Sequence, residues 1–236
     1  MWNKLSRRVF LAITGGALVS RAAVLGKEEV PSLLDHVLLG CSALESGIAF
    51  VEERTGVRAA FGGVHPGRGT ENALLALGPR RYLEIIAPDP KQGRVEQFSI
   101  ITELKEPKLI GWAAHPGSLD AFAKKLTAAG VPFEGPRDGS RARPDGRMLR
   151  WKTLNLKDDA SGLLPFFIEW SADSPHPSAD APKGCSLVRF EAATPDPDAL
   201  SKQIAILGLD LSVVKADKPQ LRATIAGPKG QLPLTA

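Results

Sequence analysis

Apolar and polar residues follow each other along the chain with two periods, one typical of strands and one typical of helices. Residues 33–40 form an apolar run of strand length, and Ser42 is placed to cap a helical spacing that ends at Gly56. Strand patterns then follow in residues 57–61, 72–77 and 82–87. The pattern predicts a β-α-β-β-β unit over residues 33–90, with a glycine- and proline-rich loop at residues 62–70.

The same order of elements recurs further along the chain. Residues 109–114 have a strand pattern, and Ser118 is placed to cap a helical pattern that ends at Gly130. Strand patterns follow at residues 131–133, 148–156 and 163–170. We therefore predict a second β-α-β-β-β unit over residues 108–171, in which the charged, turn-rich segment 134–147 is an insertion that forms an exposed loop.

A third, shorter occurrence follows a proline-containing linker at residues 171–184. Its elements are a strand at 186–191, a helix at 196–207 and strands at 211–215 and 220–226. The region from 185 to 236 is thus predicted to be a truncated β-α-β-β unit. Together the repeats predict an α+β fold made of two paired β-α-β-β-β modules and a partial third.

The charge of the chain is unevenly distributed. The 236 residues hold 30 Lys and Arg against 26 Asp and Glu, a formal net charge of +4. Residues 1–26 contain Lys4, Arg7, Arg8 and Arg21 and no acidic residue, so they carry all of the excess. The remainder is neutral and the chain has one Tyr, which disfavours a basic or ring-stacking nucleic-acid-binding surface.

Residues 1–26 have the parts of an export signal. Arg7-Arg8 precedes the moderately apolar run 12–19, which is far shorter than the ~20 residues of a membrane span. The paired arginines resemble the twin-arginine signal of bacterial proteins that are exported folded, which implies the twin-arginine export machinery as a partner and a periplasmic or otherwise extracytoplasmic location. Residues 20–22 are a poor cleavage site, so retention of the leader as an anchor stays open, as does an amphipathic helix docked on the domain.

Three ionisable residues interrupt apolar strands. His36 lies in the first strand, and Glu84 and Glu169 lie at equivalent places of the two repeats. A buried carboxylate must be paired, hydrogen-bonded or bound to a cation, and a histidine with carboxylates suits divalent ions such as Mn²⁺, Fe²⁺ or Zn²⁺. The alternative is that both glutamates face water and His36 is a core histidine.

The glycine-rich segment 62–72 offers a second candidate site. Its glycines allow backbone N–H groups to approach a ligand, and His65, Thr70 and Asn72 offer side-chain hydrogen bonds. The spacing of the phosphate-binding glycine loops is absent. The alternative is a hairpin loop with a histidine that faces solvent.

The segments 35–38, 62–72, 73–78 and 82–85 resemble the glyoxalase-like domain proteins of the vicinal-oxygen-chelate superfamily. The resemblance implies that two β-α-β-β-β modules curl around a shared cavity, with metal ligands on the first and fourth strand of each module. Carried over, His36, Glu84 and Glu169 match ligand positions. In the second module the place of His36 falls near Gly111 or Trp112, which cannot bind a metal.

The resemblance implies a small-molecule enzyme of lyase, isomerase or dioxygenase type acting on an oxygen-rich or aromatic molecule. A divalent ion (Mn, Fe, Zn or Ni) would polarise substrate oxygens, and Glu84, Glu169 or His65 would move a proton. His65, Thr70, Asn72, Trp112 and Arg150 are the expected substrate-binding residues. The alternative is a metal-free binding protein like the bleomycin-resistance proteins.

Two further properties stay open at the level of the sequence. Cys41 and Cys185 can pair or can both be buried thiols. Assembly into a homodimer is a second open expectation.

Overall fold

The computed structural model describes residues 29–93, 99–157, 159 and 161–236. The export signal predicted for residues 1–26 lies outside these residues, so it stays a prediction. Within the described part of the chain, no helix combines the length and the apolar character that crossing a membrane requires. Cys41 and Cys185 are both free thiols.

The first predicted unit is present with small shifts at its ends. Its elements are β1 (Leu34–Gly40), α1 (Leu44–Thr55), β2 (Ala60–His65), β3 (Thr70–Ala76) and β4 (Tyr82–Pro88). Helix α1 begins after Ala43, which makes no side-chain cap, so the prediction of Ser42 as the cap was wrong. Gly56 ends the helix with a left-handed φ of 82°, as the spacing predicted.

The second unit repeats this order after a short helix. It consists of α2 (Ser99–Thr102), β5 (Lys108–Ala114), α3 (Leu119–Ala128), β6 (Phe133–Ala142), β7 (Met148–Leu156) and β8 (Phe166–Trp170). The Ser118 hydroxyl accepts a hydrogen bond from the Ala121 amide and caps α3, as predicted.

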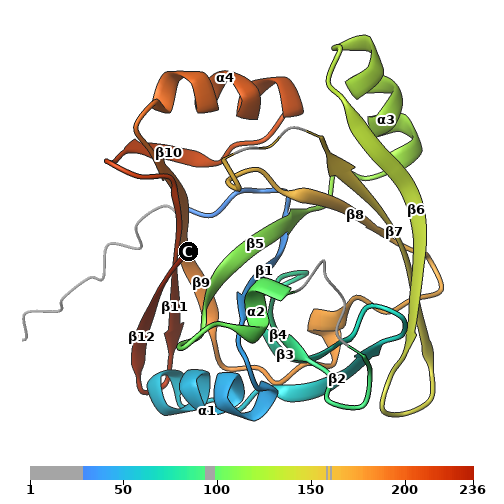
Figure 1. The fold of residues 1–236 in the computed structure, drawn as a ribbon, viewed down its shortest axis with the longest axis vertical. Coiled ribbons are helices and arrows are strands. Elements are labelled where there is room, and N and C mark those ends of the chain that lie inside the picture. Colours follow the sequence, from blue (N-terminus) through green and yellow to red (C-terminus); the bar gives the residue numbers. More distant parts are fainter. Residues whose placement is uncertain (1–28, 94–98, 158, 160) are drawn as a thin grey trace, which may run out of the picture.

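The two units share one eight-stranded sheet in the order β2-β3-β4-β1-β5-β8-β7-β6. In each unit the first strand pairs in parallel with the last, and β1 and β5 pair antiparallel at the centre. Figure 1 shows these strands curving around a common centre. At the two ends of the curled sheet, Arg141 of β6 donates a hydrogen bond from Nη1 to the carbonyl oxygen of Gly62 in β2. The α+β fold of two paired modules is thereby confirmed.

Two segments that were predicted to be loops are largely strand. Segment 134–147 lies mostly within β6, which pairs with β7 along most of its length, and segment 62–70 contains the end of β2 and its hairpin to β3. The many charged residues of β6 leave no alternation of apolar and polar residues in the sequence from which a strand could be predicted. One of these charged residues, Arg141, is nevertheless buried, with 4% of its surface exposed. The segment that was predicted to be an exposed loop is therefore part of the curled sheet.

Glycine is required where β2 passes β3 and β6. A Cβ atom on Gly62 would lie 2.5 Å from Asn72 Oδ1, and one on Gly63 would lie 2.8 Å from Arg141 Nη1. Gly63 also has a φ of 141°, which side chains rarely adopt. These two glycines therefore allow close packing of strands, a different use from the ligand approach that the sequence suggested.

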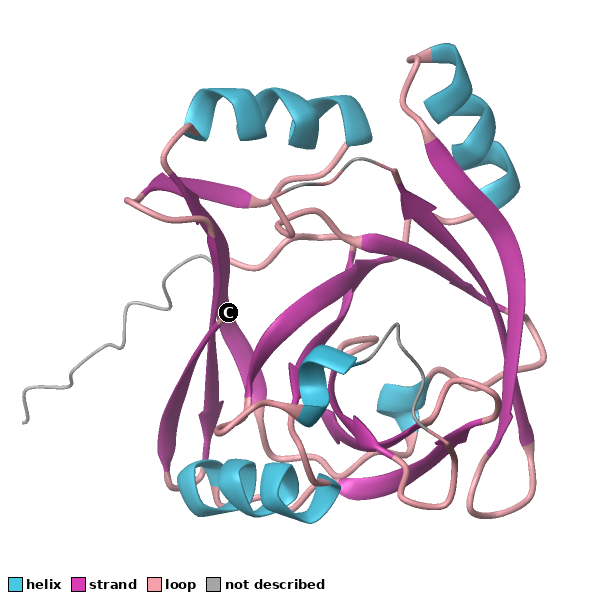
Figure 2. Cartoon of the chain, viewed as in Figure 1, coloured by secondary structure: helices cyan, strands magenta, loops and turns pink. Residues whose placement is uncertain are grey.

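The C-terminal region forms a second sheet with one more strand than predicted. It contains β9 (Ser186–Thr194), α4 (Pro197–Leu207), β10 (Ser212–Lys215), β11 (Gln220–Gly227) and the additional β12 (Gly230–Thr235). The strand order is β10-β9-β11-β12, so here the strands before and after the helix pair directly. Figure 2 shows this sheet beside the curled one, with α4 along one end.

One hydrophobic core joins the two sheets. Trp112 of β5 and Phe190 of β9 are fully buried, and their ring centroids are 5.2 Å apart. Burial of a side chain such as Phe190 contributes about 1.5 to 3 kcal/mol. The C-terminal sheet thus supports the outer face of β5 and leaves the inner face of the curled sheet free.

Candidate functional site

The inner face of the curled sheet lines a cavity of about 400 Å³. Every strand of the eight-stranded sheet contributes at least one side chain to its wall. The polar lining residues are His36, His65, Arg68, Asn72, Glu84, Arg137, Arg141, Thr153 and Asn155. The others are apolar or aromatic, and of the charged groups Glu84 and Arg141 are buried, so little water screens their charges.

Glu84 lies between two histidines in this cavity. Alternation along β4 directs Tyr82, Glu84 and Ile86 to the inner face. One carboxylate oxygen, Oε2, is 3.5 Å from His36 Nε2, and the other, Oε1, is 3.6 Å from His65 Nε2. Two of the predicted site residues, His36 and Glu84, are therefore brought together, and His65 joins them.

Asp35 holds the His36 ring in this orientation. Its Oδ1 accepts a hydrogen bond from His36 Nδ1 at 2.7 Å, which leaves Nε2 directed at Glu84. The pairing of β1 with β5 is irregular between Leu34 and His36, and such an irregularity breaks strict alternation. Asp35 and His36, although consecutive in sequence, can therefore form a hydrogen bond with each other next to the cavity.

The other oxygen of Asp35 is also occupied. Oδ2 accepts hydrogen bonds from Trp170 Nε1 and His176 Nε2, each at 3.1 Å. His176 Nδ1 accepts from the Ser178 amide at 3.2 Å, which leaves the proton of a neutral ring on Nε2. Burial alone would raise the pKa of Asp35, but the hydrogen bonds from His176 and His36 lower it well below its ordinary value. Asp35 is therefore ionised at neutral pH and holds these three side chains in place.

His65 is fixed from the opposite side of Glu84. Its Nδ1 is 2.9 Å from the hydroxyl of Thr70, which is fully buried. Asn72 Nδ2 lies 3.4 Å from His65 Nε2 and donates to Glu84 Oε1 at 2.6 Å. Thr70 and Asn72 therefore position the site. Asn72 also lines the cavity, as predicted for a binding residue, whereas Thr70 lies behind His65.

The charges of the site follow from its burial. Burial would raise the pKa of Glu84, but His36, His65, the Asn72 hydrogen bond and Arg141 together lower it, so Glu84 is a carboxylate at neutral pH. Burial lowers the pKa of His65 despite the nearby Glu84, so His65 is uncharged there. The cavity thus presents an ionised carboxylate next to a neutral imidazole.

Three other predicted site residues point away from the cavity. Glu169 lies on the opposite face of β8 from the lining residues Ile168 and Trp170, and its Oε2 accepts the Leu119 amide at 2.7 Å. Trp112 is fully buried in the core, where its Nε1 donates to the Leu163 carbonyl. Arg150 is exposed and pairs with Asp173 at 3.2 Å. The prediction was one residue out of phase in β8 and in β7, where Trp151, next to Arg150, lines the cavity. In β5 the pairing with β1 is irregular at Ile110, which lines the cavity, whereas Trp112 points into the core.

A comparison with protein families identifies the fold family of the chain. The family described as "Glyoxalase-like domain" matches residues 34–208, which is more than half of the sequence. The chain belongs to the glyoxalase-like domain family. The matched residues contain both β-α-β-β-β units and extend to the end of α4.

The chain is also similar to solved structures. A hypothetical protein from Staphylococcus aureus has a TM-score of 0.61 and 17% identity, over 86% of this chain and 84% of its own. Methylmalonyl-CoA epimerase from Mycobacterium tuberculosis has a TM-score of 0.44 and 22% identity, over 58% of this chain and 87% of its own. No curated protein matches the chain.

The donors of this glyoxalase-like domain do not form a metal-binding group. Among the described residues, no three His, Cys, Asp or Glu side chains are placed to hold an ion. Of the predicted ligands, Glu169 is directed at α3, and Glu84 Oε1 accepts a hydrogen bond from Asn72 Nδ2, an amide nitrogen that does not bind metal ions. The predicted set of His36, Glu84 and Glu169 is therefore not assembled.

The sequence analysis missed four residues of the site: Asp35, Tyr82, Arg141 and His176. One of them, Asp35, carried a signal. Asp35 precedes His36 in an apolar run, and a buried acid next to a histidine needs a partner. Arg141 and His176 lie in segments assigned as loop and linker. The tertiary structure brings Arg141 to the cavity and His176 to Asp35.

Glu169→Gln is expected to lower the stability of the glyoxalase-like domain by about 1 kcal/mol, because it weakens the cap of α3. The cavity on the other face of β8 should bind ligands as before. Urea unfolding of both proteins measures the first effect, and calorimetric titration of any cavity ligand measures the second. A large loss of affinity with unchanged stability would contradict this placement and restore Glu169 as a site residue.

Proposed function

We propose that the cavity is the active site of a lyase or isomerase that moves a proton on a small oxygen-rich or aromatic molecule. The observation that carries this proposal is the ionised Glu84 carboxylate held between His36 Nε2 at 3.5 Å and His65 Nε2 at 3.6 Å. A carboxylate in such a place can accept a proton, and the adjacent imidazoles can take it on.

The proposed step uses only groups of this chain. A C–H bond of the substrate breaks, its proton goes to a Glu84 oxygen, and the electron pair stays on the substrate as an enolate. The Arg141 guanidinium stabilises this negative charge, and Asp35 stabilises His36 if the proton passes to it. Return of the proton to another atom completes an isomerisation, and departure of a leaving group completes an elimination.

Exchange of substrate hydrogen with solvent tests this proposal. Wild-type protein is incubated in D₂O with a panel of 2-oxo acids, hydroxyketones and aryl ketones, and proton NMR follows the loss of the C–H signal. Protein-dependent deuterium incorporation into at least one compound is expected. Saturable binding without exchange would instead support the metal-free binding protein.

The divalent ion implied by the family resemblance stays a prediction with a separate test. Elemental analysis for Mn, Fe, Zn and Ni is made on protein purified without chelator. Exchange that survives removal of all four metals supports chemistry by the side chains alone. Exchange that disappears and returns with one added metal would show that His36 and Glu84 act with an ion.

A further inference from the structure

The cavity has more positive than negative charge on its wall. Arg68, Arg137 and Arg141 line it, and among the described residues Glu84 is the one carboxylate that does. Asp35 lies behind His36 and its charge is taken up by three hydrogen bonds. A ligand that brings one negative charge therefore reduces the imbalance.

The arginines are only partly committed to other contacts. Arg141 is buried, and among the described residues its guanidinium makes one hydrogen bond, from Nη1 to the Gly62 carbonyl, which leaves its other N–H groups available. Arg137 pairs with Glu134 at 2.8 Å, but both side chains are largely exposed, so this pair is weak. Arg68 is exposed on the hairpin between β2 and β3 and makes no side-chain hydrogen bond or ion pair with a described residue.

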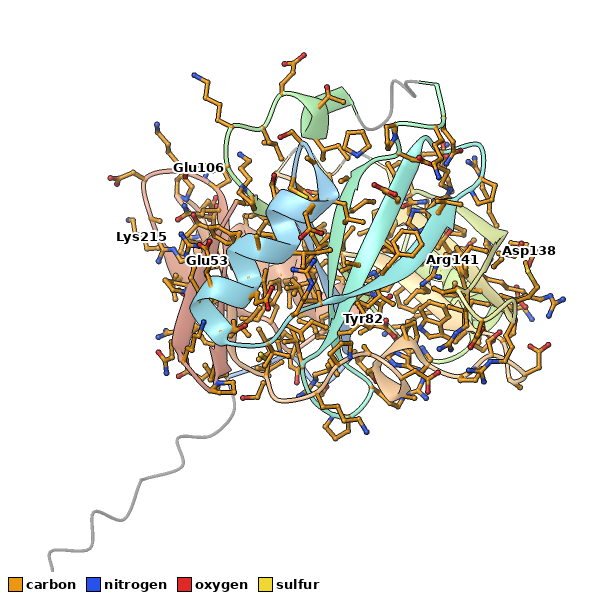
Figure 3. The ribbon with its side chains drawn as sticks, turned by 90° about the horizontal axis from the view of Figure 1, so that it is seen from below. Glu53, Tyr82, Glu106, Asp138, Arg141 and Lys215 are labelled. Atoms are coloured by element: carbon orange, nitrogen blue, oxygen red, sulfur yellow. The ribbon has the colours of Figure 1, made fainter. Side chains whose placement is uncertain are left out.

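The rest of the wall suits an apolar, ring-bearing body. Trp151 and Trp170 line the cavity together, with ring centroids 5.7 Å apart, and Phe166 lies on the same face. Apolar side chains of α2 and β5, Ile101 and Ile110, complete this part. Figure 3 shows Arg141 and Tyr82 in the half of the molecule that contains the curled sheet, whereas Glu53 and Lys215 lie in the other half.

We propose that the ligand of this cavity is a small aryl carboxylate, whose anionic group binds Arg68, Arg137 and Arg141 and whose ring packs on Trp151 and Trp170. This inference rests on the proposed function, because it places the carbon next to the carboxylate near Glu84. Guanidinium groups bind carboxylates through paired N–H donors, which gives both affinity and orientation.

Calorimetric titration of the full chain with 3-phenylpropionate and its neutral amide, 3-phenylpropionamide, tests the charge preference. We expect the carboxylate to bind at least ten-fold more tightly, with a preference that weakens at high salt. Arg68→Gln should reduce the preference several-fold, and Arg141→Gln should remove most of it. Arg68 is exposed, so its variant gives a result even if the Arg141 variant fails to fold.

Arg147→Gln is the matched control, because Arg147 lies on the hairpin between β6 and β7, is 59% exposed and pairs with Asp145 outside the cavity. The Arg147→Gln variant should prefer 3-phenylpropionate over 3-phenylpropionamide as strongly as the wild type does. Equal affinity for both probes, no saturable binding of either, or an unchanged preference in the Arg68 and Arg141 variants would overturn the inference.

Glu84→Gln separates this inference from the proposed function. Removal of the carboxylate charge should leave the binding of 3-phenylpropionate intact or make it tighter, since a like charge is lost. Absence of deuterium exchange in the wild type together with selective binding of the carboxylate would refute the enzyme and keep the anion site. Deuterium exchange that occurs only in neutral compounds would support the enzyme and refute the anion site.

Discussion

Glu84→Gln is expected to lower the rate of deuterium exchange by about 100- to 10,000-fold, the range in which a positioned general base contributes. The substitution preserves shape, and the new amide oxygen can still accept the hydrogen bond that Asn72 Nδ2 donates to Oε1 at 2.6 Å. The variant should therefore fold like the wild type while it loses the proton acceptor. Proton NMR measures the rate on the best compound of the panel.

The pH dependence of exchange gives a second readout for the same residue. The surrounding charges lower the pKa of Glu84, so the wild-type rate should stay high well into the acidic range and fall only below the ordinary value for a glutamate. The matched control is Glu71→Gln in the neighbouring strand β3, whose side chain lines a shallow groove on the outside. A normal rate in Glu84→Gln, or an equal loss in Glu71→Gln, would refute Glu84 as the base.

Most of the fold could be predicted because local patterns decide it. Helices α1, α3 and α4 have apolar residues at helical spacing and are followed closely by Gly56, Gly130 and Gly208, and the duplication of one unit indicated the fold class. Strand β6 could not be predicted in this way. Its sequence is charged on both faces because one face is exposed and the other lines a polar cavity, so no apolar alternation remains.

The candidate site was predicted in part in the first unit, where Asp35 and Tyr82 were nevertheless missed. The repeat and the glycine-rich segment suggested two separate candidate sites, and His36, His65, Asn72 and Glu84 line one cavity, as the family resemblance implied. The site residues predicted in the second unit were less successful. A shift of one residue along a strand moves a side chain to the other face, and an alignment of repeats that contains an insertion does not determine the alignment to within one residue. Glu169 is the example: its neighbour Ile168 lines the cavity.

Residues brought in by tertiary structure could not be found from spacing. His176 lies in the linker between the two sheets, 141 residues from Asp35 in sequence, and still makes a buried hydrogen bond with it. Arg141 reaches Gly62 only because the sheet closes. Both contacts depend on the overall curvature, which the apolar pattern does not specify.

Asp35→Ala is expected to cost about 3 to 5 kcal/mol of unfolding free energy, the range for removal of one partner from a buried charged network. The Asp35 side chain is 1% exposed and accepts hydrogen bonds from His36, His176 and Trp170. The alanine variant therefore leaves two buried donors, on His36 and His176, and the partly buried Trp170 Nε1 without this partner. Asp173→Ala is the control, since Asp173 is 64% exposed and pairs only with Arg150 at the surface. Urea unfolding at pH 7 should show less than about 1 kcal/mol for this control.

The pH dependence of this loss distinguishes an ionised anchor from a simple packing role. Folding lowers the pKa of Asp35, so its stabilisation is complete above the ordinary value of 3.8 and is lost as pH falls toward the lower value of the folded state. The difference in unfolding free energy between wild type and Asp35→Ala should therefore be constant from neutral pH down to about pH 5 and shrink only in strong acid. A difference that does not change with pH would show that Asp35 acts through its volume. Asp35→Asn keeps the volume without the charge, so in that case it should be as stable as the wild type. If Asp35 acts through its charge, Asp35→Asn should also lower the free energy of unfolding.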